Sequence, residues 1–355
     1  MSDAYLALES GRVVEARGRV PGVTQGELVF TTAYTGYEES LTDPSYEEQV
    51  LTFAYPLIGN YGVRSERFES DRVHPSAVVS RELTDDVASW LEAEGVPAID
   101  HIDTRDLVLD IRDRGAMKCG IAAGSEATPE QAKAQLEACP SMSDHTDIGN
   151  QVSVAELQVH GMDNDGPDVA LIDCGVKGSI IDSLVARDAT VSVLPYDTTP
   201  GAIESVDPDL LFISNGPGDP KNFEAAEALV DHYAGELPIA GICLGQQVVA
   251  NALGGSTKKM EFGHRGVNQP VRDCRTNKVV MTTQNHGYTV DDVGELEVTQ
   301  INVNDDTPEG LDNADLEIIT RQYHPEAHPG PNDSLGFFDE VLEMATKSFR
   351  PVAAD

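Results

Sequence analysis

Residues 237–247 read Leu-Pro-Ile-Ala-Gly-Ile-Cys-Leu-Gly-Gln-Gln, and this stretch decides the fold of the second half of the chain. An apolar, β-prone run leads into Gly-x-Cys-x-Gly, and residues 247–253 have a composition that favours a helix. Glycines on both sides of a reactive residue at a strand-to-helix turn are typical of a nucleophile elbow. A helix N-terminus stabilises a thiolate, so we predict that Cys243 is a nucleophile and not a buried structural cysteine.

A histidine further along the chain is the candidate proton carrier for this nucleophile. Residues 316–323 read as a strand that ends at His324, and Pro325 follows it. Because residues two apart in an extended segment lie on the same side, we expect Glu326 beside the imidazole, where a carboxylate fixes the tautomer and stabilises the imidazolium. In a chain with 61 acidic residues such a pair also arises by chance, and it gains weight only together with Cys243.

A third segment, residues 212–220, reads Phe-Ile-Ser-Asn-Gly-Pro-Gly-Asp-Pro and follows another apolar strand. Gly-Pro-Gly after a strand usually marks only a turn. Near a nucleophile elbow it also predicts a rigid loop whose backbone N–H groups stabilise an oxyanion, together with the amide of Leu244.

Strand-like and helix-like segments alternate from residue 168 onwards. Strands are expected at 169–173, 190–194 and 209–213 and before Cys243, and helices at 179–187, 224–234 and 334–347. This rhythm is typical of a mostly parallel, doubly wound α/β sheet with helices on both faces. The polar stretch 161–167 predicts a boundary, so we expect two domains, 1–160 and 168–355. The first, with short strands, turns and a helical patch near 85–94, is expected to be a smaller mixed α/β domain.

Acidic residues dominate the charge of the whole chain. The sequence contains 61 Asp and Glu against 24 Lys and Arg, which gives a formal net charge of −37. Nucleic acid and anionic membranes are excluded as partners because both would be repelled. The acids are scattered and form no tail, which favours adaptation to high salt over a site for a basic protein. At molar salt the Debye length is about 3 Å, so self-repulsion is screened; we predict a halophilic, archaeal source.

The cysteines and histidines indicate neither disulfides nor a metal site. Five widely spaced cysteines without a Cys-x-x-Cys pair fit no disulfide framework and no zinc site. Cys174 also follows a strand and precedes a glycine, so its local pattern superficially rivals that of Cys243. His264, His286 and His328 are assigned packing or surface roles. The chain shows no signal peptide and no apolar run near 18 residues, so we expect a soluble, cytoplasmic protein.

Three motifs resemble the class I, or triad, glutamine amidotransferase family. They are Asn-Gly-Pro-Gly-Asp-Pro at 215–220, Gly-Ile-Cys-Leu-Gly-x-Gln at 241–247 and His-Pro-Glu at 324–326. Residues 285–288, Asn-His-Gly-Tyr, fit the loop that lines the glutamine pocket in that family. This resemblance covers roughly residues 168–350. Because residues 173–177 match the family's first strand and turn and not its nucleophile, the resemblance implies that Cys174 is structural.

The amino-terminal half is similar to the small subunit family of glutamine-dependent carbamoyl-phosphate synthase. The segments that carry this similarity are 35–46 (Thr-Gly-Tyr-Glu-Glu-Ser-Leu-Thr-Asp-Pro-Ser-Tyr), 55–62 (Tyr-Pro-Leu-Ile-Gly-Asn-Tyr-Gly) and 100–107 (Asp-His-Ile-Asp-Thr-Arg-Asp-Leu). Taken by themselves, these segments indicate only strands, a turn and a possible helix cap near Asp103. With them, the resemblance extends over nearly the whole chain.

The resemblance implies a mechanism and a set of site residues. Cys243 would attack the side-chain carboxamide of L-glutamine, His324 would protonate the departing ammonia, and Glu326 would orient His324. The implied contacts with glutamine are Ser45, Gly216, Gly218, Leu244, Gln247, Asn285, Gly287 and Tyr288, with the amides of Gly216 and Leu244 holding the oxyanion. Since Ser45 belongs to the first domain, the pocket is expected at the domain interface.

The resemblance also implies a partner. Ammonia would pass to a separate large subunit that makes carbamoyl phosphate from bicarbonate and ATP, for arginine and pyrimidine biosynthesis, in a heterodimer. The chain lacks a Walker-type phosphate loop, so it is expected to hold no cofactor, with ATP and Mg on the large subunit.

Two positions depart from the family pattern, and three alternatives stay open. Gln246 stands where the family often has His, and Tyr288 stands where it often has Phe. The alternatives are the glutaminase component of another biosynthetic enzyme such as anthranilate synthase, a non-catalytic regulatory subunit, and a free-standing γ-glutamyl or cysteine hydrolase. The amino-terminal segments disfavour the first, the intact Cys and His disfavour the second, and the third would be active without a partner.

Overall fold

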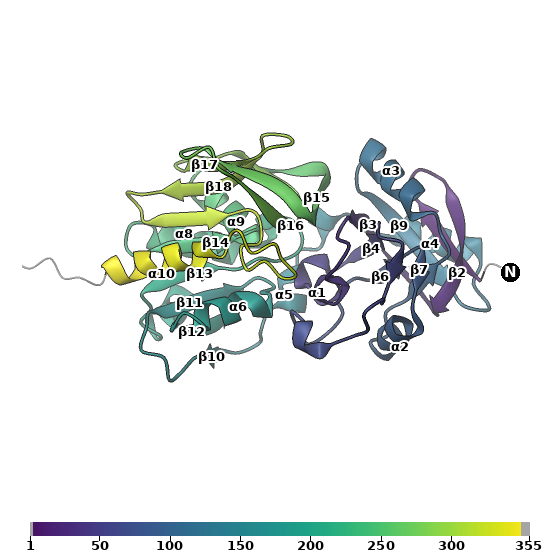
Figure 1. Ribbon diagram of the computed structural model, residues 1–355, viewed down its shortest axis with the longest axis horizontal. Helices are drawn as coiled ribbons and strands as arrows, with labels where there is room; N and C mark the ends of the chain where they lie inside the picture. Colours follow the sequence, from purple (N-terminus) through teal and green to yellow (C-terminus); the bar gives the residue numbers. More distant parts are fainter. Residues whose placement is uncertain (1–2, 349–355) are drawn as a thin grey trace, which may run out of the picture. The chain divides into compact units, whose positions relative to one another are not determined.

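The structure, a computed structural model, describes residues 3–348, and the chain divides into two compact units (Figure 1). Unit 1 contains residues up to Thr146 together with Met260–Gly266, and unit 2 contains Asp147–Lys259 and the residues from Val267 onwards. Residues 147–160, which the sequence analysis placed in the first domain, lie in unit 2. The reason is that strand β10 (Gln158–His160) pairs antiparallel with β12 (Thr190–Pro195).

A closed barrel forms the centre of unit 1, with strand order β1-β2-β8-β6-β4-β3-β9. The strands are β1 (Ala4–Leu8), β2 (Val13–Val20), β3 (Gly22–Thr31), β4 (Gln49–Phe53), β6 (Ala77–Val79), β8 (Ala98–Asp100) and β9 (Met117–Ala123). Apolar side chains such as Leu6, Leu28 and Val50 are fully buried in its core. The short strands expected from the sequence are present, and the pairing of β1 with β9 closes them into a barrel.

Short helices and one small sheet complete unit 1. They are α1 (Tyr37–Leu41), η1 (Pro44–Tyr46), η2 (Ser65–Arg67), α2 (Asp85–Ala93), α3 (Thr104–Arg114), α4 (Pro129–Ala138) and η3 (Met142–Asp144), with β5 (Leu57–Ile58) paired to β7 (Glu82–Leu83). Asp103 caps α3 by accepting a hydrogen bond from the Asp106 N–H, so the predicted helix cap is confirmed.

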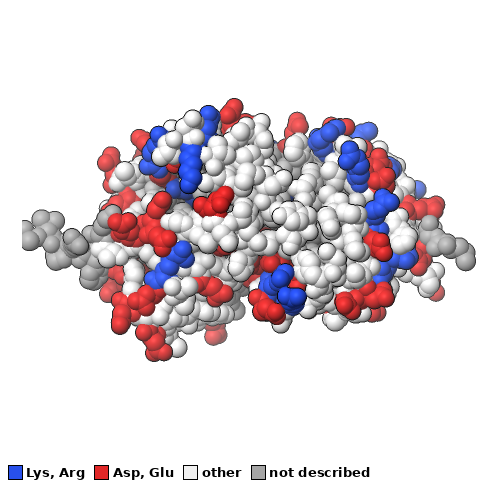
Figure 2. Space-filling model, in the orientation of Figure 1, with Lys and Arg blue, Asp and Glu red and all other residues white. Residues whose placement is uncertain are grey.

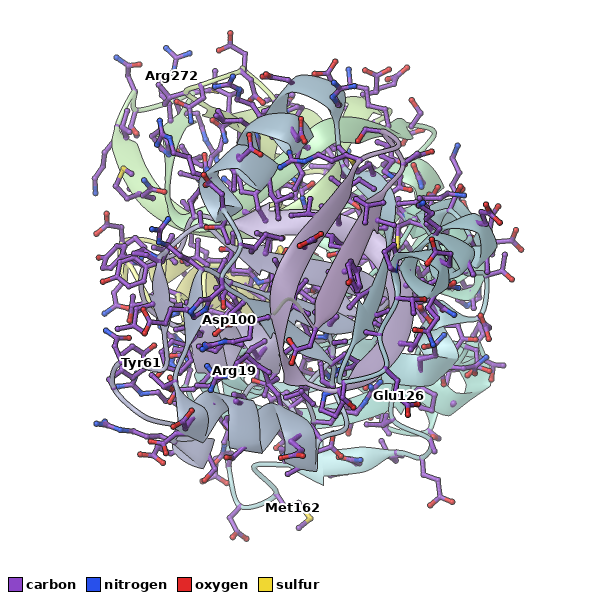
Figure 3. The ribbon with its side chains drawn as sticks, turned by 90° about the vertical axis from the view of Figure 1, so that its right-hand side faces the viewer. Arg19, Tyr61, Asp100, Glu126, Met162 and Arg272 are labelled. Atoms are coloured by element: carbon purple, nitrogen blue, oxygen red, sulfur yellow. The ribbon has the colours of Figure 1, made fainter. Side chains whose placement is uncertain are left out.

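A buried carboxylate at the end of β8 links three strands of unit 1. Asp100 accepts hydrogen bonds from Arg17 at 2.8 and 2.7 Å, from Arg19 at 3.0 Å and from the Leu83 N–H at 3.2 Å; Figure 3 labels Arg19 and Asp100. Burial alone would raise the pKa of this carboxyl, but the hydrogen bonds from Arg17, Leu83 and Arg19 lower it below its ordinary value. Part of segment 100–107 is therefore a structural anchor of the barrel.

A ten-stranded sheet forms unit 2, with strand order β10-β12-β11-β13-β14-β19-β18-β17-β15-β16. The central strands run parallel: β12, β11 (Asp168–Asp173), β13 (Leu210–Ile213), β14 (Ile239–Ile242) and β19 (Ile318–Arg321). The remaining strands are β15 (Ser256–Asp273), β16 (Val279–Asp292), β17 (Glu297–Asn302) and β18 (Pro308–Asn313). All the strands expected between residues 169 and 242 are confirmed, within one or two residues.

Helices cover both faces of this sheet (Figure 1). Side chains of α6 (Gly178–Val185) and α10 (Gly336–Ser348) share one apolar core with β11, β12, β13 and β14. Helices α8 (Glu224–Tyr233) and α9 (Leu244–Ala252) pack together, with α9 against β13, β14 and β19. Two short helices, α5 (Ile148–Val152) and α7 (Pro200–Glu204), and the single turn η4 (Pro220–Asn222) lie in connections. The predicted doubly wound α/β fold is confirmed.

Acidic side chains are spread over both units on the face drawn in Figure 2, in agreement with their scatter along the sequence. All five cysteines are free thiols, and four of them are buried. Within residues 3–348 no helix has the length and apolar character needed to span a membrane.

Candidate active site

The candidate nucleophile lies at the carboxyl edge of the parallel strands of unit 2. Strand β11 pairs with β12 on one side and with β13 on the other, so the strand order reverses there. In open α/β sheets ligands bind outside the carboxyl ends of the strands near such a reversal. The segments that follow β11, β13, β14 and β19 carry Cys174, Gly216, Cys243 and His324, respectively.

Cys243 forms a strained turn between β14 and α9. Its φ of 55° and ψ of −105° are a conformation that residues with a side chain rarely adopt, and such strain concentrates at functional sites. Gly245 permits the turn, because a Cβ atom there would lie 2.2 Å from the carbonyl oxygen of Ile213. The Cys243 N–H donates to the carbonyl of Arg321 at 2.8 Å, which ties the elbow to β19. The predicted strand–turn–helix arrangement is present.

The thiol of Cys243 is buried beside the imidazole of His324. The side chain is 2% exposed, and Sγ lies 3.6 Å from the carbonyl oxygen of Asn285. Among the described residues, Nε2 of His324 has no hydrogen-bond partner of standard geometry, yet Cys243 lies close enough to influence the pKa of the ring. An imidazole nitrogen that faces a thiol without another partner is suited to take up and return its proton.

His324 and Glu326 form a short, fully buried pair. Nδ1 of His324 lies 2.6 Å from Oε1 of Glu326, so this nitrogen carries a proton and Nε2 faces the thiol. Burial would lower the pKa of His324, but the charge of Glu326, the nearby thiol of Cys243 and the hydrogen bond with Glu326 raise it to about 10. This direction of the shift favours the imidazolium form of His324, and an imidazolium stabilises a neighbouring thiolate.

Lys177 completes this charge cluster, and the sequence analysis did not identify it. Its Nζ donates to Oε1 of Glu326 at 2.9 Å, the same oxygen that His324 contacts, and both side chains are almost fully buried. Burial would raise the pKa of Glu326, but the charges of Lys177 and His324 lower it well below its ordinary range. Lys177 lies at the end of the Asp-Cys-Gly-Val-Lys turn. In the sequence, the one feature that could have drawn attention to it is that lysines are scarce in this chain.

The Gly-Pro-Gly loop packs closely against the turn after β11. A Cβ atom at position 216 would lie 2.1 Å from the carbonyl oxygen of Cys174, and Gly218 has a φ of +84°. Both glycines are thus required by the backbone path. Within the described part of the chain, the amides of Gly216 and Leu244 donate no hydrogen bond, so both N–H groups are available to a bound oxyanion.

The loop quoted for the glutamine pocket is part of β16 and is joined to His324. The His324 N–H donates to the carbonyl of Thr283 at 2.9 Å. This places Asn285, His286, Gly287 and Tyr288 along the strand beside the triad. His286 contacts the carbonyl of Tyr288 through Nδ1 at 2.8 Å, in agreement with the packing role assigned to it.

Gln247 and its neighbour Gln246 are both buried, with separate partners. Nε2 of Gln247 donates to the carbonyl of Tyr288 at 2.9 Å and to Oε1 of Gln322 at 3.0 Å. Gln246 accepts a hydrogen bond from Thr320 Oγ1 at 3.3 Å, so this departure from the family pattern is accommodated by packing under the elbow. Sequence reasoning did not identify Gln322.

Ser45 is the one predicted site residue that lies in unit 1. It belongs to η1, and its N–H donates to the carboxylate of Asp43 at 2.9 Å. The structure of unit 2 brings Cys243, His324 and Glu326 together with the residues of β16 and the loop at 216–218. A buried thiol, an imidazolium, an orienting carboxylate and free amides are the parts needed for acyl transfer.

Comparisons with known proteins identify the families that the two parts of the chain match. Residues 170–344 match the family described as glutamine amidotransferase class-I, and residues 6–121 match the CPSase domain of the carbamoyl-phosphate synthase small chain. The carbamoyl phosphate synthase small chain of Halobacterium salinarum is 72% identical over 355 residues, with 100% of each chain covered.

Two further similarities are more distant. The carbamoyl phosphate synthase small chain of Archaeoglobus fulgidus is 44% identical, over 96% of this chain and 98% of that protein. A solved structure of a glutamine amido transferase from Methylobacillus flagellatus is 16% identical with a TM-score of 0.42; the match covers 54% of this chain and 98% of that one.

Proposed function

Because the chain belongs to the carbamoyl phosphate synthase small chain family, we propose that Cys243, His324 and Glu326 hydrolyse L-glutamine in it. The activity is that of the glutaminase subunit of glutamine-hydrolysing carbamoyl-phosphate synthase. The observation that carries the residue assignment is that the imidazole of His324, 2.6 Å from Glu326, lies close enough to the elbow cysteine for Cys243 to influence its pKa.

The first half of the proposed reaction forms a thioester. The Cys243 thiolate attacks the carboxamide carbon, and the amides of Gly216 and Leu244 hold the resulting oxyanion. His324 then donates its Nε2 proton to the departing nitrogen, so that the C–N bond breaks and ammonia leaves. Glu326 stabilises the imidazolium before this step and fixes the ring while it is neutral.

The second half releases glutamate. His324, now neutral, takes a proton from water, and the hydroxide attacks the thioester carbon. Collapse of the second oxyanion breaks the C–S bond and restores the thiolate beside the imidazolium. The resting ion pair is thus regenerated without an external acid or base.

The substrate pocket is assigned to residues around this centre. We assign Gly218, Gln247, Asn285, Gly287 and Tyr288 to contacts with glutamine, in addition to Gly216 and Leu244. In support, Asn285 lies at the thiol and Gln247 is bound to the backbone of Tyr288. Ser45 stays a prediction of the family resemblance.

The proposed partner is a carbamoyl-phosphate synthase large subunit, to which ammonia passes and on which ATP and Mg would bind. Free thiols at all five cysteines fit a reducing compartment, which supports a cytoplasmic location. The ammonia would serve carbamoyl phosphate formation for arginine and pyrimidine biosynthesis.

Reconstitution with the large subunit in molar KCl tests the proposal. We expect a stable complex whose carbamoyl phosphate synthesis depends on glutamine and is matched by an equal amount of glutamate released. Glutaminase activity that is complete in the isolated chain, without binding to the large subunit, would identify a free-standing hydrolase instead.

A further inference from the structure

Gln322 is a buried polar side chain that the mechanism above does not use. It lies between β19 and His324 and is 0% exposed, and its N–H donates to the carbonyl of Glu309 at 2.9 Å. Its side-chain oxygen Oε1 accepts the hydrogen bond from Nε2 of Gln247 at 3.0 Å. Burying a carboxamide destabilises the folded protein unless its hydrogen bonds are made, so the partners of the Gln322 side chain are informative.

The contact fixes the orientation of the Gln247 carboxamide. The amide nitrogen Nε2 has two protons, and two oxygens receive them: the carbonyl of Tyr288 at 2.9 Å and Oε1 of Gln322. A rotation by half a turn would bring the oxygen of Gln247 against both acceptors, which would repel it. The oxygen Oε1 of Gln247 therefore points away from them, and no described residue donates to it.

The other end of Gln322 has no partner within the described residues. Its Nε2 is buried and makes no hydrogen bond with any residue between 3 and 348, so within that range the side chain of Gln322 is bonded to Gln247 alone. A buried donor without a partner carries a cost. The Gln322 carboxamide is thus buried in spite of this cost, and its contact is with Gln247, a residue of the proposed pocket.

We propose that Gln322 is a positioning residue that holds the carboxamide oxygen of Gln247 as an acceptor for the substrate. An oxygen acceptor recognises N–H groups, and the strongest donor of L-glutamine is its α-ammonium group. Gln322 thereby contributes to selecting a substrate with an ammonium group. This inference rests on the proposed contact of Gln247 with glutamine.

Two variants of Gln322 in the holoenzyme test this role through the KM for glutamine at molar salt. Gln322→Met keeps the length of the side chain and removes the acceptor, so we expect KM to rise about tenfold while kcat changes less than about twofold. Gln322→Glu keeps an acceptor oxygen, so its KM is expected within about threefold of the wild-type value. A lower KM in Gln322→Glu than in Gln322→Met would show that the acceptor oxygen matters, and not only the volume of the side chain.

Gln246→Met is the matched control. Gln246 is the neighbouring buried glutamine in the same layer, and its hydrogen bonds go to Thr320 and Pro308 instead of the Gln247 side chain. We expect its KM to change less than about twofold. An equal rise of KM in Gln246→Met and Gln322→Met would show a general packing effect and overturn the proposal.

A double-variant cycle with Gln247→Met separates this inference from the proposed function. If Gln322 acts through Gln247, Gln322→Met adds less than about a twofold rise in KM when Gln247 is already Met. A tenfold rise in both backgrounds, or an unchanged KM in Gln322→Met alone, would overturn the positioning role. An unchanged KM in Gln247→Met alone would overturn the proposed pocket as well. Thermal melting followed by circular dichroism identifies any variant that fails to fold, and Gln322→Glu then decides the question.

Discussion

Cys174 and Cys243 follow two parallel strands of the same sheet, β11 and β14, but the surroundings of the two thiols differ. Cys174 follows β11, is 0% exposed and has a pKa raised well above its ordinary value, by burial first and then by the charge of Asp173. Cys243 is almost as buried, but it has a positive φ, begins a helix and faces an imidazolium. A buried thiol after a strand is therefore expected to be inert unless other segments place a cation and free amides beside it, as the segments after β19 and β13 do at Cys243.

A change of salt concentration is expected to produce the largest effect, because the difference in reactivity between Cys174 and Cys243 depends on the folded structure. With a net charge of −37, unscreened carboxylates repel one another across the folded surface at low ionic strength. Dialysis from molar KCl to 50 mM salt should abolish helical circular dichroism and glutaminase activity and make both cysteines react alike. Restored salt should recover all three properties.

A protein that stays folded and active at 50 mM salt would contradict this, and the acidity would then need another explanation. Sedimentation in the same salt series follows the complex with the large subunit, which should dissociate before the small chain unfolds if that partner is also acidic.

Identical substitutions at the two cysteines should separate their roles most sharply. Cys243→Ser should lower glutamine hydrolysis by roughly 10⁴- to 10⁶-fold, because serine lacks the thiolate that the elbow stabilises. Cys174→Ser should keep activity within about threefold and lose at most about 3 kcal/mol of stability from the buried hydroxyl.

The holoenzyme with Cys243→Ser should still use added ammonia. Wild-type glutaminase activity in Cys243→Ser would remove the assignment, and loss of ammonia-dependent synthesis as well would point to a structural role for this residue.

Replacing the proton carrier should cost nearly as much as losing the thiol. His324→Asn is expected within about tenfold of the Cys243→Ser loss, since residues that act as a unit have non-additive effects. The variant Cys243→Ser/His324→Asn, measured beside the single variants, should be no worse than either one. Additive losses would mean that the two residues act independently.

Glu326→Gln should have a smaller effect, roughly 10²- to 10⁴-fold in kcat. The amide oxygen still accepts a hydrogen bond from Nδ1 of His324 but no longer offsets the charge of the imidazolium. Steady-state kinetics of His324→Asn and Glu326→Gln side by side test the order. Equally mild losses in both variants would contradict the His-x-Glu assignment.

Lys177→Met should have the smallest effect on rate, roughly tenfold, and a clear effect on the pH profile. Lys177 lowers the pKa of Glu326, so without it this pKa rises and the carboxylate is protonated at a higher pH. The acidic limb of the kcat/KM profile should therefore move upward in pH. Lys221→Met, at an exposed position on η4, is the control and should leave that limb in place. An unshifted limb in Lys177→Met would show that the lysine has no electrostatic role at the triad.

The two cysteine turns also show what the sequence alone could predict. The strand-to-helix turn at Cys243 was predicted correctly because its glycines and the preceding strand are local signals. The local pattern at Cys174 is similar, so only the family resemblance indicated a structural role for that cysteine. The barrel of unit 1 was not predicted, since it closes through β1 and β9, which are far apart along the chain.

The missed site residues have the same cause. Lys177 meets Glu326 across 149 positions of sequence, and Gln247 meets Gln322 across 75. No local sequence pattern around Lys177 or Gln322 indicates these distant partners. Their roles depend on which strands lie side by side, which is a property of the sheet order.

The most direct test of the account is to trap the acyl intermediate. The holoenzyme is mixed with L-glutamine at molar salt, quenched in acid during turnover, digested and analysed by mass spectrometry. The account predicts a glutamyl thioester on the peptide that contains Cys243, no thioester in Cys243→Ser, and an unmodified peptide around Cys174. A glutamyl group on Cys174, or glutamine hydrolysis at full rate without any acylated cysteine, would contradict the claim that the elbow thiol is the nucleophile.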